Sequence, residues 1–173
     1  MGLLETQNFL ARIYTDENLR HAFLKEPERI GLKAGLCKAE IADLTQILPY
    51  ELNYFAESLF YKRLHGAEKF LPQVREVLKS NFENYFHEFA NQFIPRSIKK
   101  HHEDAVEFCK FLRRKKLEPE WAKDVVKFEQ AQMEFNAGDK RFIFKIFDYD
   151  LKTKQKRKKF HCWLMIGNRR IIF

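Results

Sequence analysis

The stretch from Asn136 to Asp150, "NAGDKRFIFKIFDYD", marks the point at which the hydrophobic pattern of this 173-residue chain changes. Upstream of it, apolar residues recur every three or four positions, as they do on one face of an α-helix. From Lys140 onward they alternate and are rich in aromatic and β-branched types, which favours β-strands. We therefore predict a mainly α protein, a helical bundle followed by a small C-terminal antiparallel β-hairpin or three-stranded sheet.

The clearest helical pattern precedes this point in "NFENYFHEFANQF", residues 81–93. Its aromatic residues recur at i, i+3, i+4, i+7 and i+11, which places them on one core-facing stripe. Capping residues and prolines divide the remaining helical region, and Asp16, Pro27 and Pro72 stand where helices are expected to begin. A long helix is expected from Tyr50 to about Phe70.

Two apolar segments enclose a cationic one in the C-terminal region. The segment "KFHCWLMIGNRRIIF", residues 159–173, alternates around Gly167-Asn168, a pair that favours a hairpin turn. The preceding "LKTKQKRKK", residues 151–159, is expected to form a loop. Two or three strands are not stable alone, so we expect the sheet to pack on the helical body.

The formal net charge of +8 is confined to the same region. Residues 139–173 carry all of this excess, whereas residues 1–138 are neutral. A strongly basic segment can neutralise the phosphates of a nucleic acid, and exposed rings can stack on its bases. The candidate nucleic-acid-binding residues are Lys154, Lys156, Arg157, Lys158 and Lys159, with Phe160 or Trp163 as the stacking ring. The alternative is a solvated loop that contacts no partner.

A second group of chemically active residues lies in "SIKKHHEDAVEFCKFLRRKK", residues 97–116. His101 and His102 diverge by about 100° around a helix, whereas metal ligands on one helix need i, i+3 or i+4 spacing. Cys109 falls on an apolar stripe and is expected to be buried. We therefore predict an amphipathic helix here, and no catalytic residue, metal ligand or cofactor in the chain.

The cysteines indicate the compartment. Cys37, Cys109 and Cys162 are widely spaced and form no C-x-x-C pair, which argues against a disulfide framework and a zinc site. The sequence also shows no secretory signal and no apolar run of membrane-spanning length. We expect a cytoplasmic protein that does not bind a membrane.

The middle of the chain carries a family resemblance. The relevant positions are "YKRL" at 61–64, Pro72, Val74, Leu78, Phe82, Phe86, Phe89, "PRS" at 95–97, "FCKFL" at 108–112 and "WAKDVVKFEQA" at 121–131. Residues 61–131 thereby resemble the N-terminal domain of the HvfC/BufC family, often labelled a DNA-binding domain. The family usually has Tyr-Gly at the positions of Asp104 and Ala105.

The N-terminal region shows a different resemblance. The segment "DENLRHAFLKEPERIGLKAGLCKAEIADL", residues 16–44, is similar to small helical LigA-like modules. In those modules an F-L-x-x-P pattern and a Gly-Leu pair precede a Thr or Ser cap three residues before Glu. Here Cys37 takes the cap position before Glu40, which weakens the expected capping box.

The two resemblances imply three parts and an accessory role. The expected parts are a LigA-like subdomain at residues 1–48, a HvfC/BufC-like domain at 49–137 and a basic β-hairpin appendage at 138–173. The implied function is that of a non-enzymatic bacterial interaction protein that docks onto a partner enzyme or regulator. The alternative is a nucleic-acid-binding, transcription-regulatory protein that uses the basic appendage. The partner's identity and the oligomeric state stay open.

Overall fold

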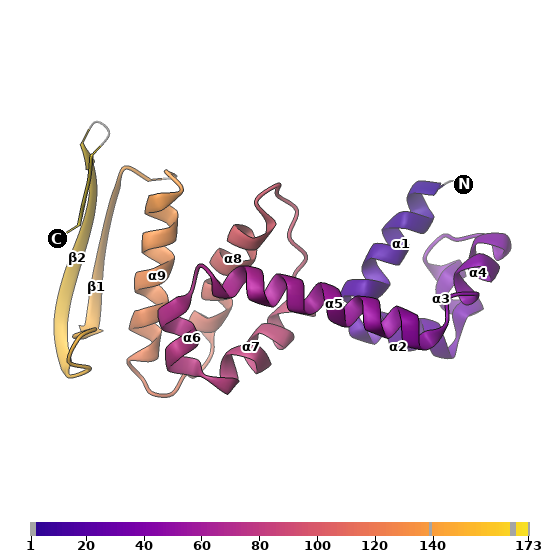
Figure 1. Ribbon diagram of the computed structural model, residues 1–173, viewed down its shortest axis with the longest axis horizontal. Helices are drawn as coiled ribbons and strands as arrows, with labels where there is room; N and C mark the ends of the chain where they lie inside the picture. Colours follow the sequence, from indigo (N-terminus) through magenta and orange to yellow (C-terminus); the bar gives the residue numbers. More distant parts are fainter. Residues whose placement is uncertain (1–2, 139, 167–168, 173) are drawn as a thin grey trace. The chain divides into compact units, whose positions relative to one another are not determined.

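The computed structural model describes residues 3–138, 140–166 and 169–172, and Figure 1 shows a series of helices followed by strands. The helices are α1 (Leu3–Thr15), α2 (Glu17–Lys25), α3 (Pro27–Lys33), α4 (Lys38–Thr45), α5 (Pro49–Glu68), α6 (Pro72–Leu78), α7 (Ser80–Ala90), α8 (Lys100–Arg114) and α9 (Ala122–Asn136). The strands are β1 (Phe142–Tyr149), β2 (Lys156–Ile166) and β3 (Arg169–Ile172). The predicted mainly α fold with a C-terminal antiparallel sheet is confirmed. The expected turn at Gly167-Asn168 lies outside the described residues.

The chain divides into two compact units. Unit 1 comprises Met1–Arg63 and Ala90–Ile94, and unit 2 comprises Leu64–Phe89 and Pro95–Phe173. The first boundary therefore falls inside α5. The parts expected at residues 1–48 and 49–137 follow family resemblance, and the part at 138–173 follows the change of hydrophobic pattern; all three stay a prediction. None of the described helices combines the length and the apolar character needed to cross a bilayer.

Unit 1 is built around a small apolar core. Its buried members are Phe9, Ile13, Phe23, Leu36, Ile41, Leu44 and Leu52. The predicted cap at Asp16 is present, because its carboxylate accepts the N–H of Leu19 at 2.9 Å and so begins α2. Gly31 allows α3 to approach α4 closely, since a Cβ there would lie 2.5 Å from Cγ1 of Ile41.

The helical part of unit 2 has an aromatic core. Phe82, Phe86 and Phe89 on α7 are buried, as the helical spacing predicted. Their rings lie 5.2, 5.1 and 5.4 Å from the ring of Phe108 on α8. Edge-to-face and tilted ring pairs of this kind stabilise a core beyond their buried area. This core fixes α7 against α8.

Helix α9 is packed on more than one side. In Figure 1 it stands between the sheet and helices α6 and α8, and it packs against all three. On the sheet side, Ala131 and Phe135 of α9 form a buried cluster with Ile143, Phe147 and Trp163. The predicted packing of the sheet on the helical body is therefore present in unit 2.

The sheet has the strand order β1-β2-β3 and is antiparallel throughout. The expected loop at residues 151–159 is wrong in extent, because β2 already begins at Lys156. The pairing of β1 with β2 continues through an irregularity after Phe147 to the pair Tyr149↔Lys156. Asp150 closes the turn by accepting the N–H of Lys152 and Thr153. Cations that stay in water do not prevent a strand from forming, so charge alone was a poor guide to the loop.

Candidate functional site

The C-terminal sheet has two apolar faces. Ile143, Phe147 and Trp163 face α9 and are buried. The residues between them point the other way, because side chains alternate along a strand. We call this second set the outer face. It consists of the exposed Phe142, Phe144, Ile146, Phe160 and Ile166, with exposed fractions of 50–72%, and of the half-buried Cys162, Leu164 and Ile171.

The strand register joins the outer face into one surface. Phe142 pairs with Leu164, Phe144 with Cys162, and Ile146 with Phe160. Directly paired side chains lie about 4.5–5.5 Å apart at Cβ, within contact distance. The rings of Phe144 and Phe160 also meet diagonally, with centroids 6.1 Å apart and planes inclined by 31°. The described part of the sheet therefore presents a continuous apolar surface on the side away from α9.

Sequence reasoning missed the outer face, although a signal for it exists. Between Phe142 and Phe147 only Lys145 is not apolar, and Phe160–Ile166 is apolar except for His161. A strand with one solvated face alternates apolar and polar residues, whereas a near-continuous apolar run is typical of a strand covered on both faces. The run therefore indicated two apolar faces, not one.

Three of the five predicted nucleic-acid-binding cations contact neighbouring side chains. The Nζ of Lys154 lies 4.4 Å above the ring of Trp121, and that of Lys156 lies 5.9 Å above Tyr149. Lys159 forms an ion pair of 3.3 Å with Asp150. Backbone N–H groups of Thr153 and Lys152, together with Lys159, lower the pKa of Asp150 to about 2.

The other two predicted cations, Arg157 and Lys158, are exposed on β2, and their side chains form no ion pair or hydrogen bond with the described residues. Phe160 lies two residues further along β2 and is the most exposed ring of the outer face. Trp163 is fully buried against α9, so the expectation that it stacks on bases is wrong. The five cations therefore do not form one row free to meet phosphates.

The histidine pair on α8 has a packing role. A Cβ at Gly66 would lie 2.1 Å from Nδ1 of His101, so this ring fills the space that the glycine leaves. The ring of His102 meets Phe70 edge-on at 5.6 Å. The buried Nδ1 of His101 and Nε2 of His102 have no hydrogen-bond partner in the described part of the chain. No group of three potential metal-ligating side chains occurs among those same residues.

Cys109 on α8 is buried, as predicted. Burial raises the pKa of its thiol well above the usual range, and the negative charges of Glu129 and Glu134 raise it further. A thiol of this kind stays protonated and reacts slowly, because the thiolate is the reactive form. Cys109 therefore has the character of a core residue.

Two buried carboxylates of α9 bond to different neighbours. Glu129 accepts the N–H groups of Gln73 at 2.9 Å and Val74 at 3.0 Å, and so caps the N-terminus of α6. Burial raises the pKa of Glu129, and the two hydrogen bonds offset this only in part. The other carboxylate, Asp124, lies five residues earlier on α9. The two carboxylates therefore face different neighbours of α9.

Asp124 fixes the irregular end of β1. Its carboxylate accepts the N–H groups of Asp148 at 2.7 Å and Tyr149 at 2.9 Å. In a regular strand two consecutive N–H groups point to opposite sides, so one of these would face β2. The register shift after Phe147 turns both of them toward α9. Asp124 therefore satisfies donors that the bulge would otherwise leave without a partner.

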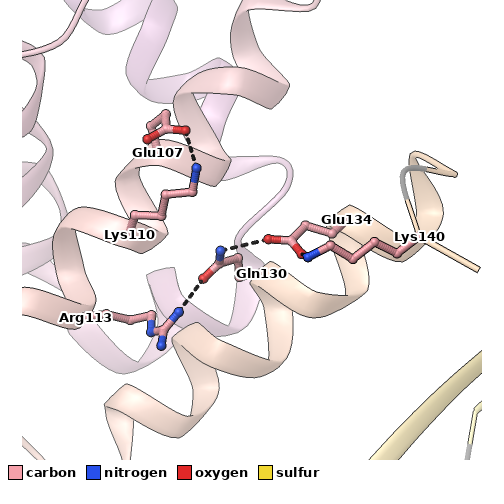
Figure 2. A network of polar contacts seen from close by, with 6 residues as sticks. All are labelled: Glu107, Lys110, Arg113, Gln130, Glu134 and Lys140. Carbon is pink, nitrogen blue, oxygen red and sulfur yellow. Dashed lines mark hydrogen bonds and ion pairs between the residues drawn. The ribbon is translucent and has the colours of Figure 1, made fainter. Parts of the chain in front are cut away.

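A polar network connects α8, α9 and the entrance to β1 (Figure 2). Arg113 donates to the amide oxygen of Gln130 at 3.5 Å, and the amide nitrogen of Gln130 donates to Glu134 at 2.9 Å. Lys140, just before β1, pairs with Glu134 at 2.7 Å. Burial would raise the pKa of Glu134, but the bonds from Lys140 and Gln130 lower it overall. The network holds the segment that leads into β1, and the first residue of β1, Phe142, belongs to the outer face.

No family model, curated protein or solved structure matches this chain. The resemblances to HvfC/BufC domains and to LigA-like modules stay predictions.

Proposed function

We propose that this chain is a non-enzymatic interaction module that docks a partner protein on the outer face of its C-terminal sheet. The observation that carries the proposal is the exposure of Phe142, Phe144, Ile146, Phe160 and Ile166 on one side of the sheet. Contiguous apolar surfaces of this kind mark binding sites in monomeric proteins, whereas single exposed apolar residues do not.

The composition of the outer face favours a protein as the occupant. Ile146, Leu164, Ile166 and Ile171 are aliphatic, and aliphatic side chains pack well against other apolar side chains. Nucleic-acid bases are instead bound by aromatic stacking and by cations along the backbone. Following the resemblances, the partner is an enzyme or a regulator, and the compartment is the bacterial cytoplasm. The three free cysteines, Cys37, Cys109 and Cys162, suit a reducing compartment.

Cys162 provides a test at the centre of the outer face, because it is half-buried there opposite Phe144. A Cys37→Ser protein would carry a photo-cross-linker on Cys162 and be irradiated in an extract of the source cells. A Cys162→Ser protein labelled at the exposed Cys37 of unit 1 is the matched control. We expect one protein to be cross-linked through Cys162 and not through Cys37.

Binding of that purified protein then separates docking from chance proximity. We expect Phe144→Thr and Phe160→Thr to weaken its affinity about tenfold or more, as for truncation of buried interface side chains. Ile98→Thr, at a fully exposed loop position, should leave it unchanged. Identical cross-linked proteins from Cys162 and Cys37, or equal affinity for all three variants, would contradict the proposal.

A second candidate function is binding of nucleic acid, which the exposed Phe160 beside Lys158 and Arg157 favours. Five phosphate contacts with duplex DNA give a log–log salt slope of about −4.5, at roughly −0.9 per contact. With Lys154, Lys156 and Lys159 held by neighbouring side chains, two contacts and a slope of about −1.8 are expected. Changing Arg157 and Lys158 to Gln should then remove binding altogether. A slope near −4.5 with sub-micromolar, sequence-selective affinity would favour nucleic-acid binding over protein docking.

A further inference from the structure

Part of β2 has a strand neighbour on one side only. Strand β1 pairs with β2 from Lys156 to Leu164, but β3 pairs only with Trp163–Ile166. Beside residues 156–161, the side of β2 opposite β1 therefore has no strand partner among the described residues. At 3.3–3.4 Å per residue this open stretch is about 20 Å long. This stretch lies on the same side of β2 as β3.

The hydrogen-bonding groups on this open stretch follow from the register. Met165 donates its N–H to Arg141 at 2.8 Å, and Asp150 donates to Gln155 at 3.0 Å, so the odd-numbered residues of this strand face β1. Backbone direction alternates in an antiparallel ladder, and the even-numbered residues therefore face away from β1. Lys156, Lys158 and Phe160 thus present their N–H and C=O groups to the open side.

On the free edge of β1, side chains of α9 bond to the backbone. There, Lys127 of α9 donates to the carbonyl oxygen of Ile146, and Asp124 accepts from Asp148 and Tyr149. Side chains of α9 therefore occupy the outward backbone groups over this half of β1. No hydrogen bond of this kind reaches the outward groups of the open β2 stretch within the described chain. The outward backbone groups on the β1 edge are therefore hydrogen-bonded to α9, whereas those on the open β2 stretch can still pair with another strand.

The positive charge at the open edge indicates which kind of strand can pair with it. Lys156, Arg157 and Lys158 are exposed beside it, in a region that carries all of the chain's excess positive charge. Lysines on a sheet edge oppose pairing with a second copy of the same edge, because like charges would meet. The same cations attract a strand that carries carboxylates.

We propose that an extended acidic peptide of a partner protein adds as a strand beside Lys156–Phe160, in line with β3. Main-chain hydrogen bonds to Lys156, Lys158 and Phe160 hold it, and its alternate apolar side chains extend the outer face next to Phe160. Its carboxylates lie on the opposite face of the added strand, where they meet Arg157. This proposal rests on the proposed docking function and names the chemical nature of the docked segment.

A synthetic peptide of about eight residues that alternates Glu with Val and has one central Phe is the probe. Its affinity for the full chain is compared with that of a matched peptide in which every Glu is Lys. N-methylation separates backbone pairing from side-chain docking, since it removes N–H donors. Two peptides are each methylated on one edge only, one on either side, and a third carries methyl groups on both edges.

We expect the acidic peptide to bind and the lysine peptide to bind about tenfold more weakly or not at all. At least one single-edge methylated peptide should bind as well as the parent, because it can offer its other edge. The peptide methylated on both edges should lose about tenfold or more in affinity, since its main-chain hydrogen bonds are gone. Undiminished binding of that peptide would overturn strand addition.

Substitutions at Lys158 test the same edge from the protein side. Lys158→Pro removes an N–H that faces the open side and leaves the pairing with β1 intact. Lys158→Ala removes the same charge and keeps the N–H. We expect the affinity for the acidic peptide to be about threefold or more lower in Lys158→Pro than in Lys158→Ala. The melting temperatures of the two variants are compared as a control. If the proline variant does not fold, the methylated peptides decide the question on the unaltered protein.

The remaining outcomes are distinct. If no peptide binds, the cations serve only to keep the edge unpaired, and the proposal is wrong. Dimers that form with increasing concentration and compete with the peptide would identify a second copy as the occupant. A single-stranded oligonucleotide that displaces the peptide at lower concentration would identify nucleic acid. A partner cross-linked at Cys162 together with failure of all peptides would overturn strand addition and leave the docking function standing.

Discussion

The inner and outer faces of the C-terminal sheet carry similar side chains in opposite surroundings. Phe147 and Trp163 on the inner face are fully buried against α9, whereas Phe144 and Phe160 on the outer face are at least half exposed. Residue type therefore does not distinguish the two faces. The difference is that α9 supplies a complementary surface to one of them, and the described residues supply none to the other.

The largest expected effect separates the two faces directly. Trp163→Ala should lower the free energy of unfolding by about 3–5 kcal/mol, because it leaves a cavity between sheet and helix. Phe160→Ala, at the exposed ring of the same strand, should change it by less than about 1 kcal/mol. Urea unfolding of both variants provides the measurement. Equal losses would mean that the outer face is also part of the core.

A smaller effect is expected where α9 holds β1. Asp124→Ala leaves the N–H groups of Asp148 and Tyr149 without an acceptor and should cost about 1–3 kcal/mol. Amide hydrogen exchange at these two residues should accelerate, while Asp124→Asn, which keeps one acceptor oxygen, should show a smaller change. Unaltered exchange at both amides in Asp124→Ala would show that the bulge does not depend on this carboxylate.

The outer face should tolerate a polar substitution in the isolated protein. Phe144→Thr keeps a residue type that favours strands, so the free energy of unfolding should change by no more than about 0.5–1 kcal/mol. Binding of an apolar fluorescent dye should fall in the same variant, because the exposed apolar surface is interrupted. Ile98→Thr is the control, and an equal decrease in dye binding there would mean that the dye does not report on the outer face.

The smallest effect concerns Asp150 in the turn between β1 and β2. Its pKa is lowered from 3.8 to about 2, chiefly by the N–H groups of Thr153 and Lys152. The ionised form is therefore favoured in the folded state. Its contribution to stability is complete above the unfolded pKa and is lost as the pH falls from about 4 through about 2. A carboxyl titration followed by NMR should show this midpoint, and Asp150→Asn should remove it. A midpoint near 4 would contradict the turn geometry.

Local signals account for the part of the fold that was predictable. Asp16, Pro27 and Pro72 affect only residues close to them in the sequence, and a helix begins at each of them. The start of β2 at Lys156 was missed because it depends on pairing with Tyr149 across a bulge. Strand extent is a property of two segments together, so the polar composition of one segment does not determine it.

The candidate site was harder to predict from the sequence, because it too depends on contacts between distant segments. The sequence places the five cations in one segment, but it does not show which side chains three of them contact. Lys154 lies in a turn with φ of 60°, which brings it over Trp121 from a distant part of the chain. The outer face was detectable in the apolar run of β2, whereas the open edge depends on which residues of β2 pair with β3.

The position of α9 has a consequence for the unfolding cooperativity of unit 2. With the sheet on one side and α6 and α8 on the other, α9 cannot lose either neighbour without exposing Phe135 or Val126 to water. Asp124 and Glu129 would lose their backbone donors at the same time. Strands and helices of this unit should therefore melt in a single transition, and removal of residues 138–173 should destabilise the helices rather than release an independent domain.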